Sequence, residues 1–125
     1  MENHTEMNAK WDVQLRKGTL ELVILAALKE RTLYGLELLG LLHGLETMAI
    51  TEGTLYPLMD RLKRDGVVDA NWQQEGQSKP RKYYQLSEQG KRKLTELTLR
   101  WRKSVEDIEK LLNSPGPQPI SQKGK

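Results

Sequence analysis

Apolar positions in the first half of the chain recur every three to four residues, the period of a helix with a buried face. Residues 20–28 are apolar on most sides, which predicts a helix deep in a core. Thr19 is a favourable N-cap, and Glu21 places a negative charge in the first turn, where the helix dipole favours it. Residues 10–17 either extend this helix or form a separate turn, and Gly18 weakens the continuous alternative.

Two further short helices follow from the same period. One covers residues 34–45. The other covers residues 51–65 and ends at Gly66, which can adopt the left-handed conformation of a helix C-terminus. Pro57 has no backbone N–H, so it fits best near a helix start, where that group has no partner in the helix. We therefore expect a tight or irregular first turn, with regular helix only from Thr54 on.

The next segment changes to short runs rich in β-branched and aromatic residues, at 67–72 and 81–86. Between them lies a polar stretch that contains the turn-forming residues Gly76, Ser78 and Pro80. This combination predicts a β-hairpin with a polar tip.

A long amphipathic helix is predicted to follow Ser87, a good N-cap, and to run to about residue 113. Its apolar positions repeat close to every seventh residue, as in the seam of a coiled coil. The helix would be roughly 35–40 Å long, so its far end has little of its own domain to pack on. The seam, which we expect to pair with a second copy of the chain, consists of Leu94, Leu97, Trp101, Val105, Ile108, Leu111 and Leu112.

The order of helix, helix, helix, hairpin and long helix predicts a mainly α (α+β) fold, a winged helix-turn-helix followed by a long C-terminal dimerisation helix. In this fold the third helix can enter the DNA major groove, and the hairpin can reach the backbone or the adjacent minor groove. The expected division is a mobile N-terminal tail over 1–9, a winged helix-turn-helix DNA-binding domain over 10–86, the dimerisation helix over 87–113, and a disordered proline-rich tail over 114–125.

Composition excludes several classes of protein. The 125 residues suit one domain, and the lack of cysteine excludes disulfides, thiolate zinc sites and a thiol nucleophile. The longest apolar run, residues 22–28, is far shorter than the ~20 residues of a membrane span. The first residues lack the apolar stretch of a signal peptide, so we expect a cytoplasmic protein without membrane contact.

Charge is spread unevenly along the chain. Residues 1–59 carry five basic and eight acidic residues, whereas residues 60–125 carry fifteen and nine. The densest stretch, residues 79–103, holds nine basic residues against Glu88 and Glu96. Such asymmetry favours an anionic partner such as nucleic acid. A solvated helix face is the plainer alternative.

Four segments carry a specific likeness: LRKGTLELVILAAL (15–28), LYGLELL (33–39), TEGTLYPLMDRLKRDGVV (51–68) and RKYYQLSEQGKRKL (81–94). In these segments the sequence resembles the PadR family of bacterial transcriptional regulators, and its single long helix resembles that of the short subgroup. The resemblance implies a homodimer that binds double-stranded DNA, usually as a repressor, and is often released by a small aromatic or drug-like effector. A two-fold dimer implies a palindromic operator, with recognition helices about 34 Å apart.

Several polar and aromatic side chains are candidate DNA contacts. Tyr56 could donate a hydrogen bond to a phosphate, or could pack under the hairpin. Tyr34, which in the family lies near the DNA backbone, could instead be a core tyrosine. Thr51 and Glu52 either face the groove or simply cap the helix. The full set of candidates is Lys17, Tyr34, Thr51, Glu52, Thr54, Tyr56, Lys63, Lys79, Arg81 and Lys82.

The hairpin cations have opposite directions. Side chains alternate along a strand, so Arg81 and Lys82 face opposite ways and at most one of them is expected to point at DNA. Lys79 lies at the hairpin tip, and Trp72 is expected to pack within the hairpin.

Trp101 falls on the seam, where a dimer would bring it near its symmetry mate. The resemblance implies that paired indoles there sandwich flat aromatic ligands, and stacking would supply the affinity. The plainer alternative is that Trp101 is ordinary interface core.

The sequence shows no set of residues typical of a catalytic site. His4 and His43 are isolated and lack metal-ligand spacing, so we expect no metal, no cofactor and no enzyme. The alternative to a DNA-binding regulator is a winged-helix module that binds other proteins and not DNA.

Overall fold

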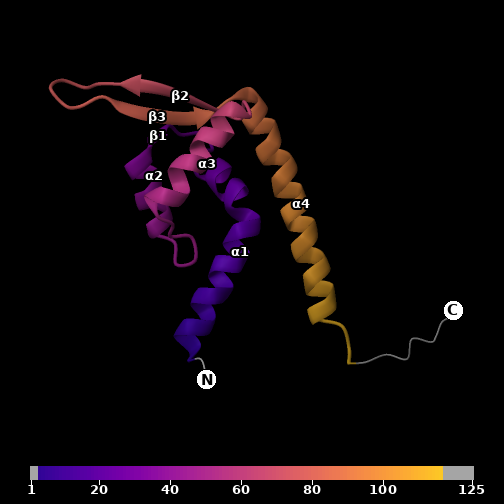
Figure 1. Ribbon diagram of the computed structural model, residues 1–125. Helices are drawn as coiled ribbons and strands as arrows, with labels where there is room; N and C mark the ends of the chain where they lie inside the picture. Colours follow the sequence, from indigo (N-terminus) through magenta and orange to yellow (C-terminus); the bar gives the residue numbers. More distant parts are fainter. Residues whose placement is uncertain (1–2, 117–125) are drawn as a thin grey trace.

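The computed structural model describes residues 3–116, which form four helices and three strands (Figure 1). The elements are α1 His4–Ala27, β1 Leu33–Tyr34, α2 Gly35–His43, α3 Glu52–Arg64, β2 Val68–Gln73, β3 Arg81–Leu86 and α4 Glu88–Leu112. This order confirms the predicted winged helix-turn-helix followed by a long helix. No helix within the described residues is long and apolar enough to cross a membrane. The predicted tail over 114–125 falls mostly outside the described residues.

The strands form one antiparallel sheet in the order β1-β3-β2. The short β1, which the sequence pattern does not reveal, pairs Leu33 with Tyr84 and Tyr34 with Tyr83. Tyr84 and Leu86 of β3 are buried, so they mark the inner face of the sheet. The alternate residues of the strand, Tyr83 and Gln85, point to the outer face. The β2–β3 hairpin extends past the helices as a wing (Figure 1).

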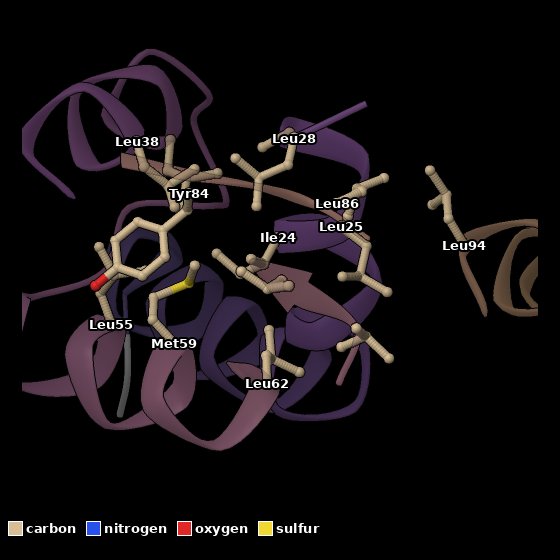
Figure 2. Packing of buried hydrophobic residues seen from close by; sticks show 14 of the residues in the cluster. Ile24, Leu25, Leu28, Leu38, Leu55, Met59, Leu62, Tyr84, Leu86 and Leu94 are labelled. Atoms are coloured by element: carbon tan, nitrogen blue, oxygen red, sulfur yellow. The ribbon is translucent and has the colours of Figure 1, made fainter. Parts of the chain in front are cut away.

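The core lies between α1, α2, α3 and the inner face of the sheet (Figure 2). From α3 it takes Leu55, Met59 and Leu62, which follow a helical period and are fully buried. They meet Ile24 of α1 and Tyr84 of β3 in a single apolar cluster. Because α3 buries this one face, its first turn and its opposite face are left exposed to a partner.

Helix α1 is longer than the sequence predicts. Residues 4–9, expected to be a mobile tail, form its first turns, because Asn3 caps the helix by accepting a hydrogen bond from the backbone N–H of Glu6 (2.8 Å). Gly18 does not interrupt the helix. Thr19, expected as the N-cap, lies inside it and donates its hydroxyl to the carbonyl four residues earlier (2.9 Å). One glycine costs a helix only about 1 kcal/mol, which the buried turns that follow outweigh.

Regular helix in α3 also begins earlier than predicted. It starts at Glu52, because the Thr51 hydroxyl caps it by accepting a hydrogen bond from the N–H of Thr54 (3.2 Å). Of the expected tight turn, the structure keeps one hydrogen bond, which the Thr54 N–H donates to the Thr51 carbonyl (3.1 Å) within the helix. Pro57 is therefore the sixth helical residue, not the third as expected. Gly66 follows the helix with a φ of +79°, as predicted.

Helix α4 begins where the sequence predicts. Ser87 accepts a hydrogen bond from the N–H of Gly90 (3.0 Å) and donates one to the carbonyl of Gly66 (2.6 Å). Gly90 is buried, and a Cβ there would collide with the carbonyl of Val67. These contacts fix the start of α4 to the turn between α3 and β2. From Leu99 on, every described residue of α4 is exposed, and the helix runs away from the domain (Figure 1).

Candidate nucleic-acid interface

The N-terminus of α3 gathers three of the predicted DNA contacts. Thr51, Glu52 and Thr54 are exposed there, and the Thr51 hydroxyl donates to the Thr54 hydroxyl (3.3 Å). Lys17 of α1, together with the two threonines, lines a cavity of about 410 Å³. A cation and two hydroxyls from separate elements therefore lie close to the exposed end of α3. Lys63 is exposed near the other end of the helix.

Tyr56 is half-buried on the flank of α3 that faces α2. Its ring lies directly against Gly35, so close that a Cβ at Gly35 would overlap the phenol. Burial raises the pKa of the Tyr56 phenol, and the nearby charge of Glu52 raises it further. The phenol therefore stays protonated and able to donate a hydrogen bond. Tyr56 thus packs against the start of α2, and its phenol also lies near enough to Tyr84 of β3 to help raise the pKa of that tyrosine.

Tyr34 and Arg81 meet on the outer face of the sheet. The rings of Tyr34 and Tyr83 pack edge to face, with centroids 5.3 Å apart. The Arg81 guanidinium carbon lies 4.6 Å from the centroid of the Tyr34 ring, a cation–π distance. The backbone N–H of Tyr34 donates to the carboxylate of Glu37 (3.1 Å), which helps cap α2. Tyr34 is therefore a packing residue that also positions Arg81.

Lys82 points to the inner face, opposite to Arg81, as strand alternation predicts. Its Nζ lies 5.9 Å from the ring centroid of buried Tyr84 and 6.0 Å from that of Trp72. Trp72, expected to pack within the hairpin, is 68% exposed, so that prediction is wrong. Trp72 lies near the end of β2, where the helices that pack on the base of the sheet leave it exposed. Lys79 is exposed near the tip.

One carboxylate that the sequence did not single out joins three helices. Glu21 of α1 forms ion pairs with Arg61 of α3 (3.3 Å) and with Lys93 of α4. Arg61 also pairs with Asp65 (3.1 Å). Burial alone would raise the pKa of Glu21, but the hydrogen bonds and charges of Lys93 and Arg61 outweigh it and lower the pKa below its ordinary value. The spacing of these residues along the chain carries no signal of this contact.

The predicted seam divides into two parts. Leu94 is buried within its own domain, and Leu97 packs partly on the same core. The exposed part consists of Trp101, Val105, Ile108, Leu111 and Leu112. Trp101 is 46% exposed and, with Leu15 and Leu22 of α1, lines a cavity of about 710 Å³ between α1 and α4.

Comparisons with known proteins decide the family. The model of the Transcriptional regulator PadR-like family matches residues 24–96, more than half of the chain. The chain belongs to the PadR-like family. A PadR family transcriptional regulator from Eggerthella lenta is 35% identical and superposes with a TM-score of 0.78, covering 90% of this chain and 97% of its own. A PadR-like transcriptional regulator from Bacillus cereus is 27% identical and superposes with a TM-score of 0.74. The match covers 82% of this chain and 99% of the Bacillus cereus chain. An uncharacterized protein of Lysinibacillus sphaericus is 30% identical over 95 residues, 74% of this chain and 87% of its own.

The PadR-like match runs from the last turn of α1 through the wing to the first turns of α4. It therefore covers the winged helix-turn-helix and stops before Trp101. Members of this family are transcriptional regulators, not enzymes. Among the described residues, no group of three or more His, Cys, Asp or Glu side chains could hold a metal ion.

Proposed function

We propose that this PadR-like regulator is a homodimer that binds double-stranded DNA and represses transcription. The observation that carries the proposal is the exposed first turn of α3, with Thr51, Glu52 and Thr54 beside Lys17 of α1. An exposed helix of this kind fits the major groove, where hydroxyl and carboxylate groups meet base edges. The cation beside it would hold a phosphate and fix the register of the helix.

The wing supplies the second contact. Lys79 near its tip and Lys82 on its inner face would neutralise phosphates, so that binding weakens as salt rises. Arg81 stacks on Tyr34 on the opposite face of the sheet, so of the two neighbouring cations Lys82 is the proposed DNA contact. Tyr56, protonated and next to Gly35, would donate to a phosphate at the edge of the major groove.

The exposed seam of α4 supports the dimer. An apolar stripe on a helix that runs away from its domain is stabilised when a second copy covers it. A two-fold axis between the α4 helices would present two α3 helices to one face of DNA, about one duplex turn apart. Occupation of such an operator would exclude other proteins and so repress transcription.

The cavity between α1 and α4 supports a small aromatic effector. Its volume of about 710 Å³ lies within the usual range for ligand sites, and Trp101 offers a flat stacking surface. A ligand there would alter the angle between α1 and α4, and with it the spacing of the two α3 helices.

Selection of bound duplexes from a random DNA library, at physiological salt, tests the proposal. The expected result is an inverted repeat whose half-sites lie about one turn apart. Recovery of no preferred sequence, combined with salt-independent capture of a protein partner, would instead indicate a protein-binding module.

A further inference from the structure

Trp72 is the most exposed tryptophan among the described residues, at 68%. It lies on β2, opposite Lys82 of β3 in the ladder, and the Lys82 ammonium sits 6.0 Å from its ring centroid. A large apolar ring held in water is unfavourable for a free protein, and the one cation over it does not bury it. The pair therefore has the composition of a contact surface, because it combines a flat apolar ring with a positive charge.

The ladder fixes which way this surface faces. Val68 pairs with Leu86, Ala70 with Tyr84 and Trp72 with Lys82, so all six side chains share the inner face of the sheet. At the base of the wing this face is covered by α3, where Tyr84 packs with Leu55 and Met59 (Figure 2). Two residues further on, Trp72 is 68% exposed, so no described helix covers this part of the inner face. Trp72 and Lys82 therefore overhang on the side of the sheet where α3 lies.

We propose that Trp72 is a DNA contact whose indole packs on the deoxyribose and base edges of the minor groove next to the major groove that α3 occupies. Lys82 holds the adjoining phosphate. This inference rests on the proposed function and adds to it an apolar contact that its cations cannot supply. Positive charge beside the ring selects an anionic partner over an apolar protein surface. Apolar side chains are a recurrent means of binding in the minor groove.

The two residues should act differently on binding. An ionic contact releases counterions from DNA, so removing it lowers the salt dependence of the affinity by about one phosphate. A ring packed on sugars and base edges releases none. The loss of Trp72 should therefore weaken binding about tenfold, the scale of one aromatic–nucleotide contact, without a change of salt slope.

The chain contains three tryptophans, so a double variant can make Trp72 the sole tryptophan, and excitation at a wavelength that tyrosine does not absorb reports it alone. The W11F/W101F protein is titrated with a duplex carrying the selected inverted repeat, and binding is scored separately by gel mobility. We expect the emission of Trp72 to be quenched on binding and protected from acrylamide. The W72F/W101F protein, which reports Trp11 on α1, should show no change. A duplex that shifts in the gel while Trp72 emission and acrylamide access stay constant overturns the inference and leaves the proposed function standing.

Affinities of W72A, W72F and K82A over a series of salt concentrations give the second readout. We expect W72A to bind DNA about tenfold more weakly, with an unchanged dependence of affinity on salt, and W72F to lose less affinity. K82A should lower the slope of log affinity against log salt concentration by about one. Wild-type affinity for W72A, at an unchanged melting temperature, overturns the inference. If no duplex binds the wild-type protein at any salt concentration, the proposed function fails and the inference fails with it.

Discussion

At the residue scale, two glycines hold neighbouring groups closer than any side chain would allow. Gly35 opens α2 directly beneath the Tyr56 ring, and Gly90 lets the first turn of α4 rest on the carbonyl of Val67. The first contact positions a candidate DNA-binding phenol, and the second fixes the long helix to the DNA-binding domain. The obstacle at Gly35 is a side chain that can move, whereas the obstacle at Gly90 is backbone.

Gly90→Ala should destabilise the fold by more than 2 kcal/mol, because either α4 or the turn before β2 must shift to admit the methyl group. Urea unfolding measures the effect. Gly18→Ala is the matched control: Gly18 also lies inside a helix, but nothing lies within 4 Å of its Cβ position. That change should stabilise the protein by about 0.5–1 kcal/mol. Similar effects at the two sites would contradict the packing described for Gly90.

Tyr56→Phe should leave the unfolding curve nearly unchanged, since the ring that packs on Gly35 is kept. It removes the hydroxyl that we assign to a phosphate, so affinity for the operator should fall about tenfold. Fluorescence anisotropy with a labelled duplex measures the loss. Full affinity in Tyr56→Phe together with a weakened Tyr56→Ala would show that the ring acts through packing alone.

At the element scale, Glu21 ties α1, α3 and α4 together through Arg61 and Lys93. The carboxylate is mostly covered, while both cations are partly solvated, so the network is worth about 1 kcal/mol. It connects the helix that would read DNA with the helix that would form the dimer.

Stability should depend on pH through Glu21. Its pKa is lower in the folded chain than the ordinary value of 4.5, so the carboxylate stabilises the fold above that value. This stabilisation is lost as the pH falls through the lower folded pKa. Glu21→Gln should therefore be about 1 kcal/mol less stable than wild type at pH 7, and the gap should close at acid pH. Thermal unfolding across pH measures it, with exposed Glu96→Gln as a control that should show no gap.

Elements with strong local signals were predicted well from sequence. Ser87 as a cap and the repeat that follows it gave α4, and the β-branched runs gave the wing. The two-residue β1 was missed because its pairing with Tyr83 and Tyr84 is non-local. The break expected at Gly18 was wrong because packing of the later turns outweighs one glycine.

The candidate site was predicted less completely. The kinds of residue at the site can be read from the sequence. The opposed directions of Arg81 and Lys82 follow from the alternation of side chains along a strand. The exposure of Trp72, the burial of Leu94 and the Glu21 network depend on how far each helix or strand extends past the elements that pack on it. Such facts belong to the tertiary structure and leave no local pattern in the sequence.

At the scale of the whole molecule, a DNA-binding dimer of this kind requires that α4 pairs with a second copy. Ile108→Glu places a charge on the exposed seam and should convert the dimer to a monomer with much weaker operator binding. Lys110→Glu is the matched control, because it lies on the opposite face of α4 and loses only an exposed ion pair with Glu106. Sedimentation velocity measures the mass. A monomeric wild-type protein, or a dimer that survives Ile108→Glu, would contradict this role for the seam.

Whether a dimer reads DNA through paired α3 helices is tested most directly by a hydroxyl-radical footprint of the wild-type protein on the duplex recovered by selection. We expect two protected patches on one face of the DNA, related by the symmetry of an inverted repeat, with centres about 34 Å apart. Each patch should include minor-groove protection on the flank that the wing reaches. A single patch, or protection without two-fold symmetry, would contradict a dimer that reads DNA through paired α3 helices.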